Sequence, residues 1–278
     1  MSALPPWNDQ AVQALTSHVR RLCPDAGVEV VAHIDSTNTE LMRRGHGCDH
    51  PPTLLVALSQ TAGRGRMGRA WQSQPGAGLT FSWGMHLAPT DWSGLSLAVG
   101  LALVEALDPV GQWCLKLKWP NDVCWQAAGT TRKLGGVLIE TQIGAAPSPA
   151  RRWCVVGVGL NLQTPDIDGA GLAPVGWNEI TGETTTPSGP DLLQACMTTL
   201  VPAMQAFELH GFGPLAERFA QRDALRGQTV VLSDGRSGAA QGVDAQGALR
   251  VLTAQGPEAV HSAEVSVRPI AAQDAPHV

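Results

Sequence analysis

A nine-residue segment that alternates glycine with arginine constrains this chain more than any other part of its sequence. Residues 63–71 read Gly-Arg-Gly-Arg-Met-Gly-Arg-Ala-Trp and follow Leu54–Leu58, an apolar run typical of a strand. Glycine lets the backbone turn tightly and approach a ligand closely. Arginine adds a permanent charge on a planar fork that matches carboxylate and phosphate. The segment, called the arginine flap below, therefore predicts a loop that closes over an anion.

Two other interpretations of the arginine flap stay open from the residues alone. One is a glycine-rich hairpin with solvated arginines. The other is a single-stranded nucleic-acid site, in which arginines contact phosphates and Trp71 stacks on a base. The formal net charge of −5 argues against the second interpretation, because nucleic-acid-binding domains usually carry a basic surface.

The size and composition of the chain predict an ordered protein. Its 278 residues are 44% hydrophobic, which is enough for one large domain or for a large and a small one. No signal segment opens the chain. The longest apolar run, Leu95–Leu107, is too short to span a bilayer. We therefore expect a cytoplasmic protein without membrane contact, whose six cysteines are reduced.

Hydrophobic periodicity predicts alternating helices and strands followed by a small all-β unit. A boundary is expected near residue 226, and residues 271–278 are expected to be a disordered tail. Residues 120–122 are predicted to form a turn, and residues 164–190 an irregular stretch with one short helix. Thr37 and Glu40 fit a capping box at the start of their helix. The predicted helices are 9–23, 37–45, 95–107, 191–209 and 214–225. The predicted strands are 28–34, 54–59, 78–86, 115–119, 134–143, 153–162, 229–232, 239–243, 249–252 and 260–267.

Four further motifs carry polar or small residues at the ends of predicted strands or within them. Residues 35–38, Asp-Ser-Thr-Asn, follow a strand and either bind a small polar ligand or only cap the next helix. Residues 116–122, Lys-Leu-Lys-Trp-Pro-Asn-Asp, suit a metal ion or an amine, or else form a simple Asx turn. Glycine pairs in residues 133–140 and 156–162 predict a flat sheet face for a ligand, or close packing against helix 95–107.

Lysine is rare in this chain, since only Lys116, Lys118 and Lys133 accompany sixteen arginines. Lysines kept under such a bias are enriched where a compact, flexible ammonium group is needed. Chance clustering on an exposed strand remains the alternative for Lys116 and Lys118.

The sequence lacks the motifs that are typical of several kinds of catalytic chemistry. There is no GxxxxGK[ST], so no nucleotide is held by a P-loop. There is also no GxSxG elbow and no His/Cys cluster with zinc spacing. Nucleophilic acyl-enzyme chemistry therefore has no evident agent.

Taken together, these motifs resemble those of the biotin–protein ligases. Residues 63–71 match that family's GRGRxGRxW flap, and residues 118–122 match its KWPND segment. Residues 133–140 resemble its KLGGxLxE strand, and residues 157–162 its GxGxNL strand. The order and approximate spacing of the motifs also agree over residues 28–270.

The resemblance implies an α+β fold with a mixed, largely antiparallel sheet flanked by helices, as in class II synthetases. This catalytic domain would span residues 1–226, and a small SH3-like β-barrel residues 227–270. The implied reaction joins biotin to ATP, forming biotinyl-5′-adenylate and pyrophosphate. The acyl group then passes to one lysine of a biotin carboxyl carrier domain of a carboxylase, and AMP is released.

The resemblance also implies roles for individual residues. Lys133, Arg64, Arg66 and Asp122 would be catalytic. Asp122 would bind Mg²⁺, or act as base for or orient the incoming amine. The implied biotin contacts are Ser36, Thr37, Asn38, Gln60, Arg64, Gly65, Arg66, Lys133, Gly135 and Gly136. The implied ATP and adenylate contacts are Arg64, Arg66, Arg69, Trp71, Asn121, Lys133 and Asn161.

Some members of the family carry an N-terminal DNA-binding domain. Residues 1–27, which precede the first predicted strand, are too few for one. We therefore expect the monofunctional form, without DNA binding, as a monomer or weak homodimer. Two rival assignments are kept: a lipoate–protein ligase, and a non-catalytic RNA-binding protein with an SH3-like module.

Overall fold

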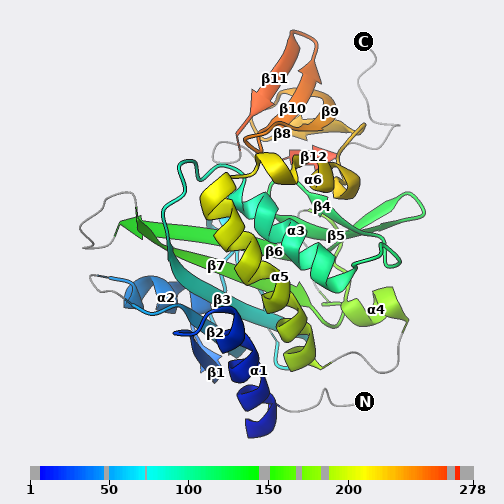
Figure 1. Cartoon of the computed structure of the whole chain (residues 1–278). Helices are drawn as coiled ribbons and strands as arrows, with labels where there is room; N and C mark the ends of the chain where they lie inside the picture. The colour runs from blue at the N-terminus through cyan, green and yellow to red at the C-terminus, as the bar shows by residue number, and fades with distance from the viewer. Residues whose placement is uncertain are drawn as a thin grey trace.

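A seven-stranded sheet crosses the centre of the molecule in the order β1-β2-β3-β7-β6-β5-β4 (Figure 1). This computed structural model describes residues 7–46, 50–72, 74–143, 151–166, 171–182, 188–261 and 267–269. Strands β1 and β2 are parallel, and the other neighbours are antiparallel. This confirms the predicted mixed, largely antiparallel sheet. Its strands are β1 (Gly27–Ile34), β2 (Thr53–Gln60), β3 (Gly78–Leu87), β4 (Leu115–Lys118), β5 (Asp122–Ala127), β6 (Thr130–Ile143) and β7 (Arg152–Asn161).

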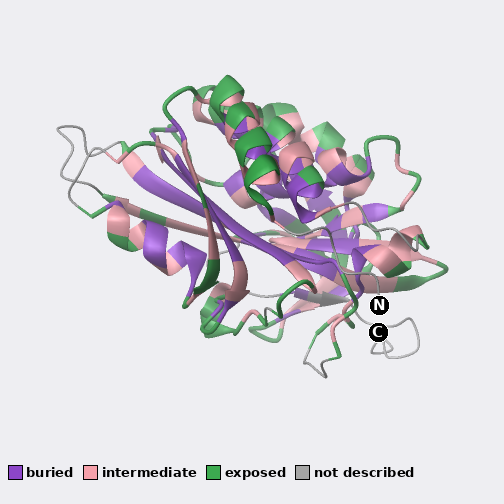
Figure 2. Ribbon diagram, turned by 90° about the horizontal axis from the view of Figure 1, so that it is seen from below, coloured by how far each residue is buried: buried purple, intermediate pink, exposed green. Residues whose placement is uncertain are grey.

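Helices cover the two faces of this sheet unequally (Figure 2). Helices α1 (Asp9–Leu22), α3 (Leu95–Leu107) and α5 (Gly189–His210) form a layer on one face, and the main hydrophobic core lies beneath them. Helix α3 is apolar on nearly every side because it lies between the sheet and α5. Among the helices of the described residues, the short α2 (Thr37–Arg44) packs on the other face, where it contacts β2, β3, β6 and β7.

A second, smaller core fixes α2 to the sheet. It contains Leu41 of α2, Leu55 of β2, and Trp153 and Val155 of β7. The fully buried indole of Trp153 donates a 2.9 Å hydrogen bond to the carbonyl of Leu41. Helix α2 is thereby held at a fixed position on the sheet, and its first turn points at the sheet centre.

The predicted capping box on α2 is wrong by one residue. Ser36 is the N-cap, and its hydroxyl accepts a hydrogen bond from the Thr39 amide at 3.4 Å. Glu40 forms ion pairs with Arg43 and Arg44 instead of reaching back to the cap. Ser36 thus satisfies the helix end, and the Thr37 hydroxyl is left for other contacts.

The C-terminal part folds as a five-stranded antiparallel sheet in the order β11-β10-β9-β8-β12, at the top of Figure 1. Its strands are β8 (Thr229–Leu232), β9 (Ser237–Val243), β10 (Leu249–Thr253), β11 (Gly256–Val260) and β12 (Val267–Pro269). Helices α4 (Trp177–Thr181) and α6 (Ala216–Arg222) precede it along the chain. The indole of Trp119, which is buried beside β4, donates a 3.0 Å hydrogen bond to the carbonyl of Gly247. This bond joins the small sheet to the large one.

Other elements differ from expectation. The predicted turn is present at residues 119–121, but strand β5, which follows it, was not predicted, because its mixed burial hid the alternation. Of the strand expected at 260–267, Val260 ends β11 and Val267 begins β12, and residues 262–266 lie outside the described residues. The helix expected at 214–225 is shorter, because α6 spans only Ala216–Arg222. The tail 271–278 lies outside the described residues, whereas a short helix within 164–190 is confirmed by α4.

No helix among the described residues is long and apolar enough to cross a membrane.

The Trp119–Gly247 hydrogen bond predicts a stability loss on substitution. Replacing Trp119 with Phe leaves the Gly247 carbonyl without its partner and opens a small cavity. We expect the free energy of unfolding to fall by about 2 kcal/mol. Urea denaturation of both proteins measures the change.

Trp125→Phe is the matched control, since Trp125 is half-buried in β5 and its indole makes no hydrogen bond within the described residues. Equal losses in the two variants would show that the hydrogen bond to Gly247 contributes nothing.

Candidate functional site

A network of buried polar side chains lies between the first turn of α2 and the centre of the sheet. The Gln60 carbonyl oxygen, Oε1, accepts hydrogen bonds from the Thr37 amide at 2.7 Å and from the Thr37 hydroxyl at 3.1 Å. Ser82 Oγ on β3 lies 2.7 Å from Thr37 Oγ1 and 2.6 Å from Asn38 Oδ1. We call Thr37, Asn38, Gln60, Ser82 and Glu140 the polar network. It is uncharged apart from Glu140.

Asn38 lies directly on the backbone of β7. Its Nδ2 donates to Glu140 Oε2 at 3.0 Å and to the Leu138 carbonyl at 3.3 Å. A Cβ atom built at Gly157 would lie only 2.1 Å from Asn38 Oδ1. Glycine is therefore required at this position by a side chain of the protein itself, so that α2 can approach the sheet.

The arginine flap forms a tight hairpin directly after β2. Its backbone is closed by hydrogen bonds from Gly65 N to Arg69 O at 2.7 Å and from Trp71 N to Gly63 O at 2.9 Å. At its tip, Met67 and Gly68 have φ angles of 56° and 72°. Two successive positive φ angles are typical of the turns that join tight hairpins. Gly68 thus supplies one of the two positive φ angles, as the glycine content of the segment indicated, whereas Met67 supplies the other.

The side chains of the flap reach back over the sheet. Arg64 Nη1 lies 3.0 Å from Glu140 Oε1, which connects the flap to the polar network. The Trp71 ring covers Gly159, where an added Cβ would lie 2.3 Å from Trp71 Cε2. Burial lowers the pKa of the Arg66 guanidinium, whereas the nearby Asp122 carboxylate opposes this shift. Arg66 is therefore a partly buried cation within electrostatic reach of Asp122 on β5.

A continuous row of paired residues crosses five strands on the α2 face of the sheet. The strand register aligns Thr80 with Gly159, Gly159 with Gly136, Gly136 with Asp122, and Asp122 with Lys118. Residues that lie directly opposite one another in neighbouring strands share a face. The row is polar at its two ends and bare of side chains in its middle, so it can hold an elongated ligand.

The β5 end of this row carries a concentration of charge. Lys133 Nζ lies 2.6 Å from Asp122 Oδ1, and Lys118 Nζ lies 3.8 Å from Asp122 Oδ2. Arg66 and Arg69 also act electrostatically on this group. Burial lowers the pKa of Lys118, and Asp122 opposes this shift. These five residues, called the charge cluster, set four cations around one carboxylate, which is an arrangement suited to a multiply charged anion.

Five further predicted site residues can be placed: two asparagines that hydrogen-bond backbone carbonyls, and three glycines. Asn121 Nδ2 donates to the Val137 carbonyl at 2.8 Å, and Asn161 Nδ2 donates to the Lys133 carbonyl at 3.3 Å. Gly135 faces the main core, since an added Cβ would lie 2.3 Å from the Gly159 carbonyl oxygen and 2.6 Å from a methyl group of Leu160. Gly136 has ordinary space beside Lys133 and Asp122. Gly65 lies in the flap backbone.

The structure also brings in residues that the sequence did not single out. Ser82, Thr80 and Glu140 all face the site from the sheet, and Thr80 Oγ1 is buried without a hydrogen-bond partner in the described part of the chain. Residues 173–175 run beside Lys133, whose amide donates to the Ala173 carbonyl at 2.8 Å. Alternation along the strand 78–86 could have indicated Ser82 and Thr80, but nothing local indicated residues 173–175.

Two kinds of chemistry do not fit these residues. The oxygens of Asp122 face two ammonium groups, and no group of three or more His, Cys, Asp or Glu among the described residues could hold a metal ion. Cys124 lies beside the charge cluster, but burial raises its thiol pKa to about 12. It stays protonated at neutral pH and is no nucleophile. Binding and neutralisation of an anion remain as the chemistry that the cluster supports.

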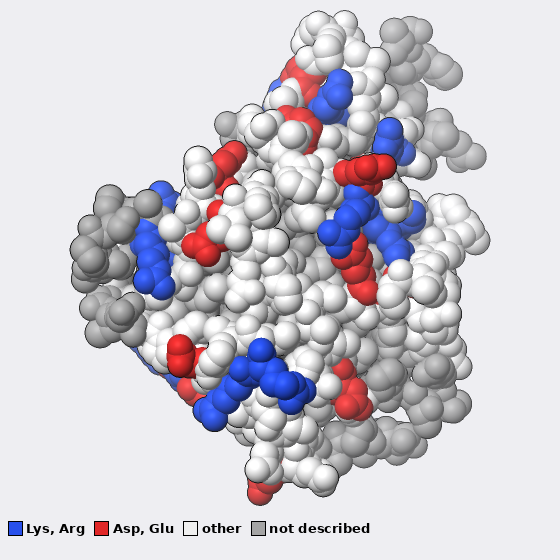
Figure 3. All heavy atoms as spheres, viewed as in Figure 1, with Lys and Arg blue, Asp and Glu red and all other residues white. Residues whose placement is uncertain are grey.

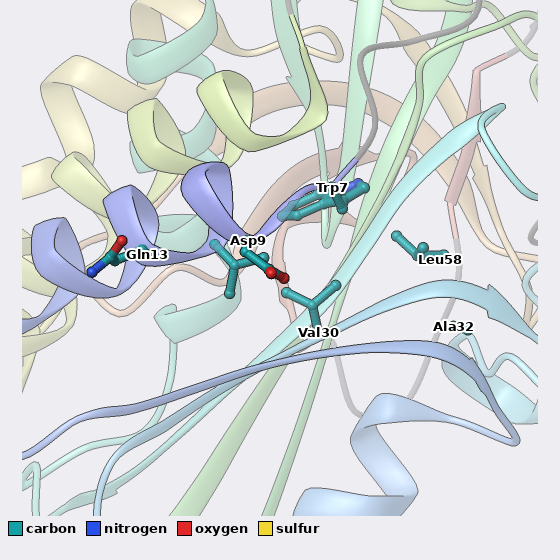
Figure 4. Close-up of a pocket in the computed structure, with 7 residues that line it drawn as sticks. Trp7, Asp9, Gln13, Val30, Ala32 and Leu58 are labelled. Carbon is teal, nitrogen blue, oxygen red and sulfur yellow. The ribbon is translucent and has the colours of Figure 1, made fainter.

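A larger hollow of about 490 Å³ lies elsewhere, between α1 and strands β1 and β2 (Figure 4). It is lined by Trp7, Asp9, Val12, Gln13, Val30, Ala32 and Leu58. Its one charged side chain is a carboxylate, and it contains none of the glycine or arginine motifs. On the helix face of the molecule, basic and acidic side chains are intermixed (Figure 3). The polar network and the charge cluster are therefore the better candidate site.

Comparison with known proteins shows that the chain is similar to biotin protein ligases. The sequence model of the biotin/lipoate A/B protein ligase family matches residues 30–161, and that of the biotin protein ligase C-terminal domain matches residues 227–268. The bifunctional ligase/repressor BirA of Escherichia coli (strain K12) is 32% identical over 233 residues, which are 80% of this chain and 68% of that protein. The biotin--[acetyl-CoA-carboxylase] ligase of Paracoccus denitrificans is 30% identical over 252 residues, covering 85% and 98%.

Solved structures agree with these relatives. The biotin protein ligase from Aquifex aeolicus in complex with biotin and ATP superposes with a TM-score of 0.72 at 27% identity. The match covers 88% of this chain and 99% of that one.

The contact between Asn38 and Gly157 predicts a cost for any larger residue at that position. Gly157→Ala must displace Asn38 and break its bonds to Ser82 and Glu140. We expect the free energy of unfolding to fall by about 1–3 kcal/mol. Thermal unfolding followed by circular dichroism measures it.

Gly136→Ala is the matched control, since the nearest atoms to an added Cβ there lie at 3.5 Å, an ordinary contact distance. If Gly157→Ala proved no less stable than Gly136→Ala, the described packing of Asn38 on β7 would be wrong.

Proposed function

The chain belongs to the biotin–protein ligases of the biotin/lipoate A/B protein ligase family, and we propose that it works through a biotinyl-5′-adenylate. Biotin and ATP are its substrates. In the proposed sequence, the biotin carboxylate is first activated with ATP. The acyl group is then transferred to one lysine of a carrier domain of a biotin-dependent carboxylase.

The observation that carries this proposal is the row across the sheet. The polar network, in which Glu140 is the one charged member and pairs with Arg64, lies toward one end of the row, and the strongly cationic charge cluster lies at the other end. The polar network offers hydrogen bonds to the neutral ureido ring of biotin. The charge cluster offers four cations where phosphates would lie. Biotinyl-adenylate has the same order of groups, because its ureido ring and its phosphate lie at opposite ends of the aliphatic chain.

The first step joins two anions, so its main requirement is charge neutralisation. A biotin carboxylate oxygen attacks the α-phosphorus of ATP, a C–O–P linkage forms, and pyrophosphate leaves. Lys133 is proposed to bind the oxygens that the carboxylate and the α-phosphate share. Arg64 and Arg66 would close over the adenylate from the flap, and Arg69 would lie toward the leaving phosphates. The charge cluster contains Lys133, Arg66 and Arg69, which supports their part of this assignment.

The biotin end would be held by neutral hydrogen bonds. Thr37, Asn38 and Gln60 already hydrogen-bond one another or Ser82, so their geometry is fixed before a ligand arrives. Ser36 caps α2 and supports them. The buried hydroxyl of Thr80, unpaired within the described residues, is a further group that a ligand could satisfy.

The adenine end would lie beside the Trp71 ring, which packs on the backbone of Gly159. Asn161 would act on this side by holding the backbone at Lys133. Asn121 similarly fixes the start of β5 through the Val137 carbonyl.

The second step needs a neutral amine. The carrier lysine has a pKa of about 10.4 in water, and its nitrogen must attack the acyl carbon while AMP leaves. Asp122 is proposed to accept a hydrogen bond from this amine and to orient it. A resident Mg²⁺ on Asp122 does not fit the two ammonium groups that face its carboxylate. We propose instead that Mg²⁺ enters with ATP as part of that substrate.

The rival lipoate ligase is less well supported. Lipoate ends in an aliphatic dithiolane, which can neither exchange hydrogen bonds with the polar network nor pair with the buried Thr80 hydroxyl, which has no partner within the described residues. Leaving a buried hydroxyl unpaired costs binding energy, so this end of the site favours biotin.

We propose that residues 1–226 form the catalytic unit and residues 227–270 a second unit. The change from α6 to the five-stranded sheet near residue 227 supports this division.

Biotin-dependent exchange of pyrophosphate into ATP tests the proposed function. We expect exchange with biotin, little with lipoate and none without an acid, because only a bound carboxylate can form the adenylate. Labelled pyrophosphate incorporated into ATP is measured. Exchange driven by lipoate, or exchange that does not respond to biotin, would contradict the proposal.

Arg66 is expected to retain the reactive adenylate, which water and stray amines destroy once it escapes. Arg66→Gly should raise the rate of adenylate release by about tenfold or more. Bystander lysines would then be labelled without selectivity. Rapid filtration of the labelled adenylate and peptide mapping of biotinylated lysines measure the two effects.

Met67→Gly is the matched control, because it adds a glycine at the exposed tip of the flap and removes no charge. Equal release rates in the two variants would mean that flap flexibility, and not the Arg66 charge, retains the adenylate.

A further inference from the structure

Lys118 carries a largely buried ammonium group at the cationic end of the site, and the proposed steps give it no role of its own. It lies on β4, directly opposite Asp122 of β5 in the strand register. Its side chain is only 11% exposed. Proteins rarely bury a lysine side chain without a partner of opposite charge. The position of Lys118 therefore needs a physical explanation.

The carboxylate that faces Lys118, that of Asp122, lies close to it but beyond hydrogen-bonding distance. Its Nζ lies 3.8 Å from Asp122 Oδ2, while Lys133 Nζ lies 2.6 Å from Asp122 Oδ1. No acceptor lies within hydrogen-bonding distance of Lys118 Nζ in the described ranges. The other charged groups near it, Lys133 and Arg69, are also cations. One carboxylate therefore has two ammonium partners, of which one is tightly and one loosely paired.

This arrangement matters because Lys133 has two competing partners in the proposed reaction. To bind the anionic substrate, Lys133 must leave Asp122. A partly buried carboxylate that loses its cation is strongly destabilised. That cost would oppose substrate binding unless a second cation replaces the first.

We propose, on the premise of the function proposed above, that Lys118 is a positioning residue that takes over the pairing of Asp122 when Lys133 turns to the substrate. Closing a gap of 3.8 Å to a hydrogen bond needs only a small rotation of a flexible side chain. Asp122 then stays ionised, with Oδ2 held by Lys118. Its other oxygen, Oδ1, is released by Lys133 and becomes free to accept a hydrogen bond from the incoming amine.

The sequence bias supports this role. The chain contains only three lysines among nineteen basic residues, and Lys118 is one of them. A guanidinium group is larger, planar and less mobile in a confined space, whereas an ammonium on a four-carbon stem can move between two positions. Arg66 also acts electrostatically on Asp122, but it comes from the flap and is not fixed in the sheet.

Lys118→Met tests the proposal in the full-length protein. Without Lys118, Asp122 has no replacement partner in the sheet and holds Lys133 more tightly. We expect kcat/KM for biotin in pyrophosphate exchange to fall by about 5- to 50-fold. Lys118→Arg should restore most of this loss, because it keeps a cation at the site.

Lys116→Met is the matched control. Lys116 lies two residues earlier on β4, and its ammonium donates to the Gln221 carbonyl at 2.9 Å, away from the charge cluster. Its removal should leave exchange unchanged. Thermal unfolding of each variant confirms that the proteins compared are folded.

The decisive measurement is a double-mutant cycle with Asp122→Asn. In that background Lys133 is not held by a carboxylate, so adding Lys118→Met should change exchange by less than about twofold. Transfer from premade biotinyl-adenylate should be impaired in Asp122→Asn itself. If Lys118→Met lowered exchange equally in both backgrounds, Lys118 would contact substrate or only support the fold, and the proposal would be overturned.

The outcomes separate this inference from the function on which it rests. A wild-type protein without biotin-dependent exchange refutes the proposed function. A wild-type protein with exchange, together with a Lys118→Met variant as active as Lys116→Met, refutes only the role of Lys118.

Discussion

The ion pair between Lys133 and Asp122 is the interaction on which the candidate site depends. It joins neighbouring strands β6 and β5 at 2.6 Å, and it balances one charge in a cluster that otherwise contains only cations. Without this carboxylate, Lys118, Lys133, Arg66 and Arg69 would repel one another. The protein can therefore keep a high density of positive charge near the sheet before any anion binds. When an anion does bind, Asp122 must release Lys133.

The second constraint is the lack of side chains in the middle of the sheet face. Gly157 and Gly159 on β7 leave no Cβ where Asn38 and the Trp71 ring approach. Strand glycines are unfavourable for stability by themselves, so their use here has a compensating purpose. One glycine lets α2 bring its polar residues onto the sheet, and the other lets the flap return across it. The same backbone thus positions both ends of the site.

The sequence predicted much of this arrangement, and its failures have identifiable physical causes. Long periodic elements such as α3 were predicted at their observed bounds, because their burial is uniform along the element. Strand β5 was missed because its residues have mixed burial and follow a strong turn signal at Pro120. The chain order of the motifs indicated a shared site, but only the strand register reveals that Thr80 and Lys118 lie in one row with Asp122.

Single side chains were harder to assign than motifs. Asn121 and Asn161 have the composition of ligand-binding residues, yet their amides hydrogen-bond backbone carbonyls. Gly135 and Gly136 are adjacent in the sequence, yet only Gly136 faces the charge cluster. The β-bulge between β5 and β6 makes such assignments unreliable from sequence, since it shifts the register between Val123 and Cys124. Polar residues at a site divide between those that touch the ligand and those that hold the backbone, and spacing alone does not separate them.

The small C-terminal sheet is connected to the charge cluster through the backbone of β4 and β5. Trp119 follows Lys118 directly and precedes Asp122 by three residues, and its indole is fixed by the Gly247 carbonyl. The Leu117 carbonyl accepts a hydrogen bond from the Ala224 amide at 2.9 Å, just before the small sheet begins. Strand β5 of the hairpin that carries Lys118 and Asp122 pairs with β6 along its length, and the turn of the hairpin is fixed by the C-terminal sheet through Trp119. Because Asp122 lies 2.6 Å from one ammonium group and 3.8 Å from the other, even a small shift of β5 would change this pairing, and the support from both sides opposes such a shift.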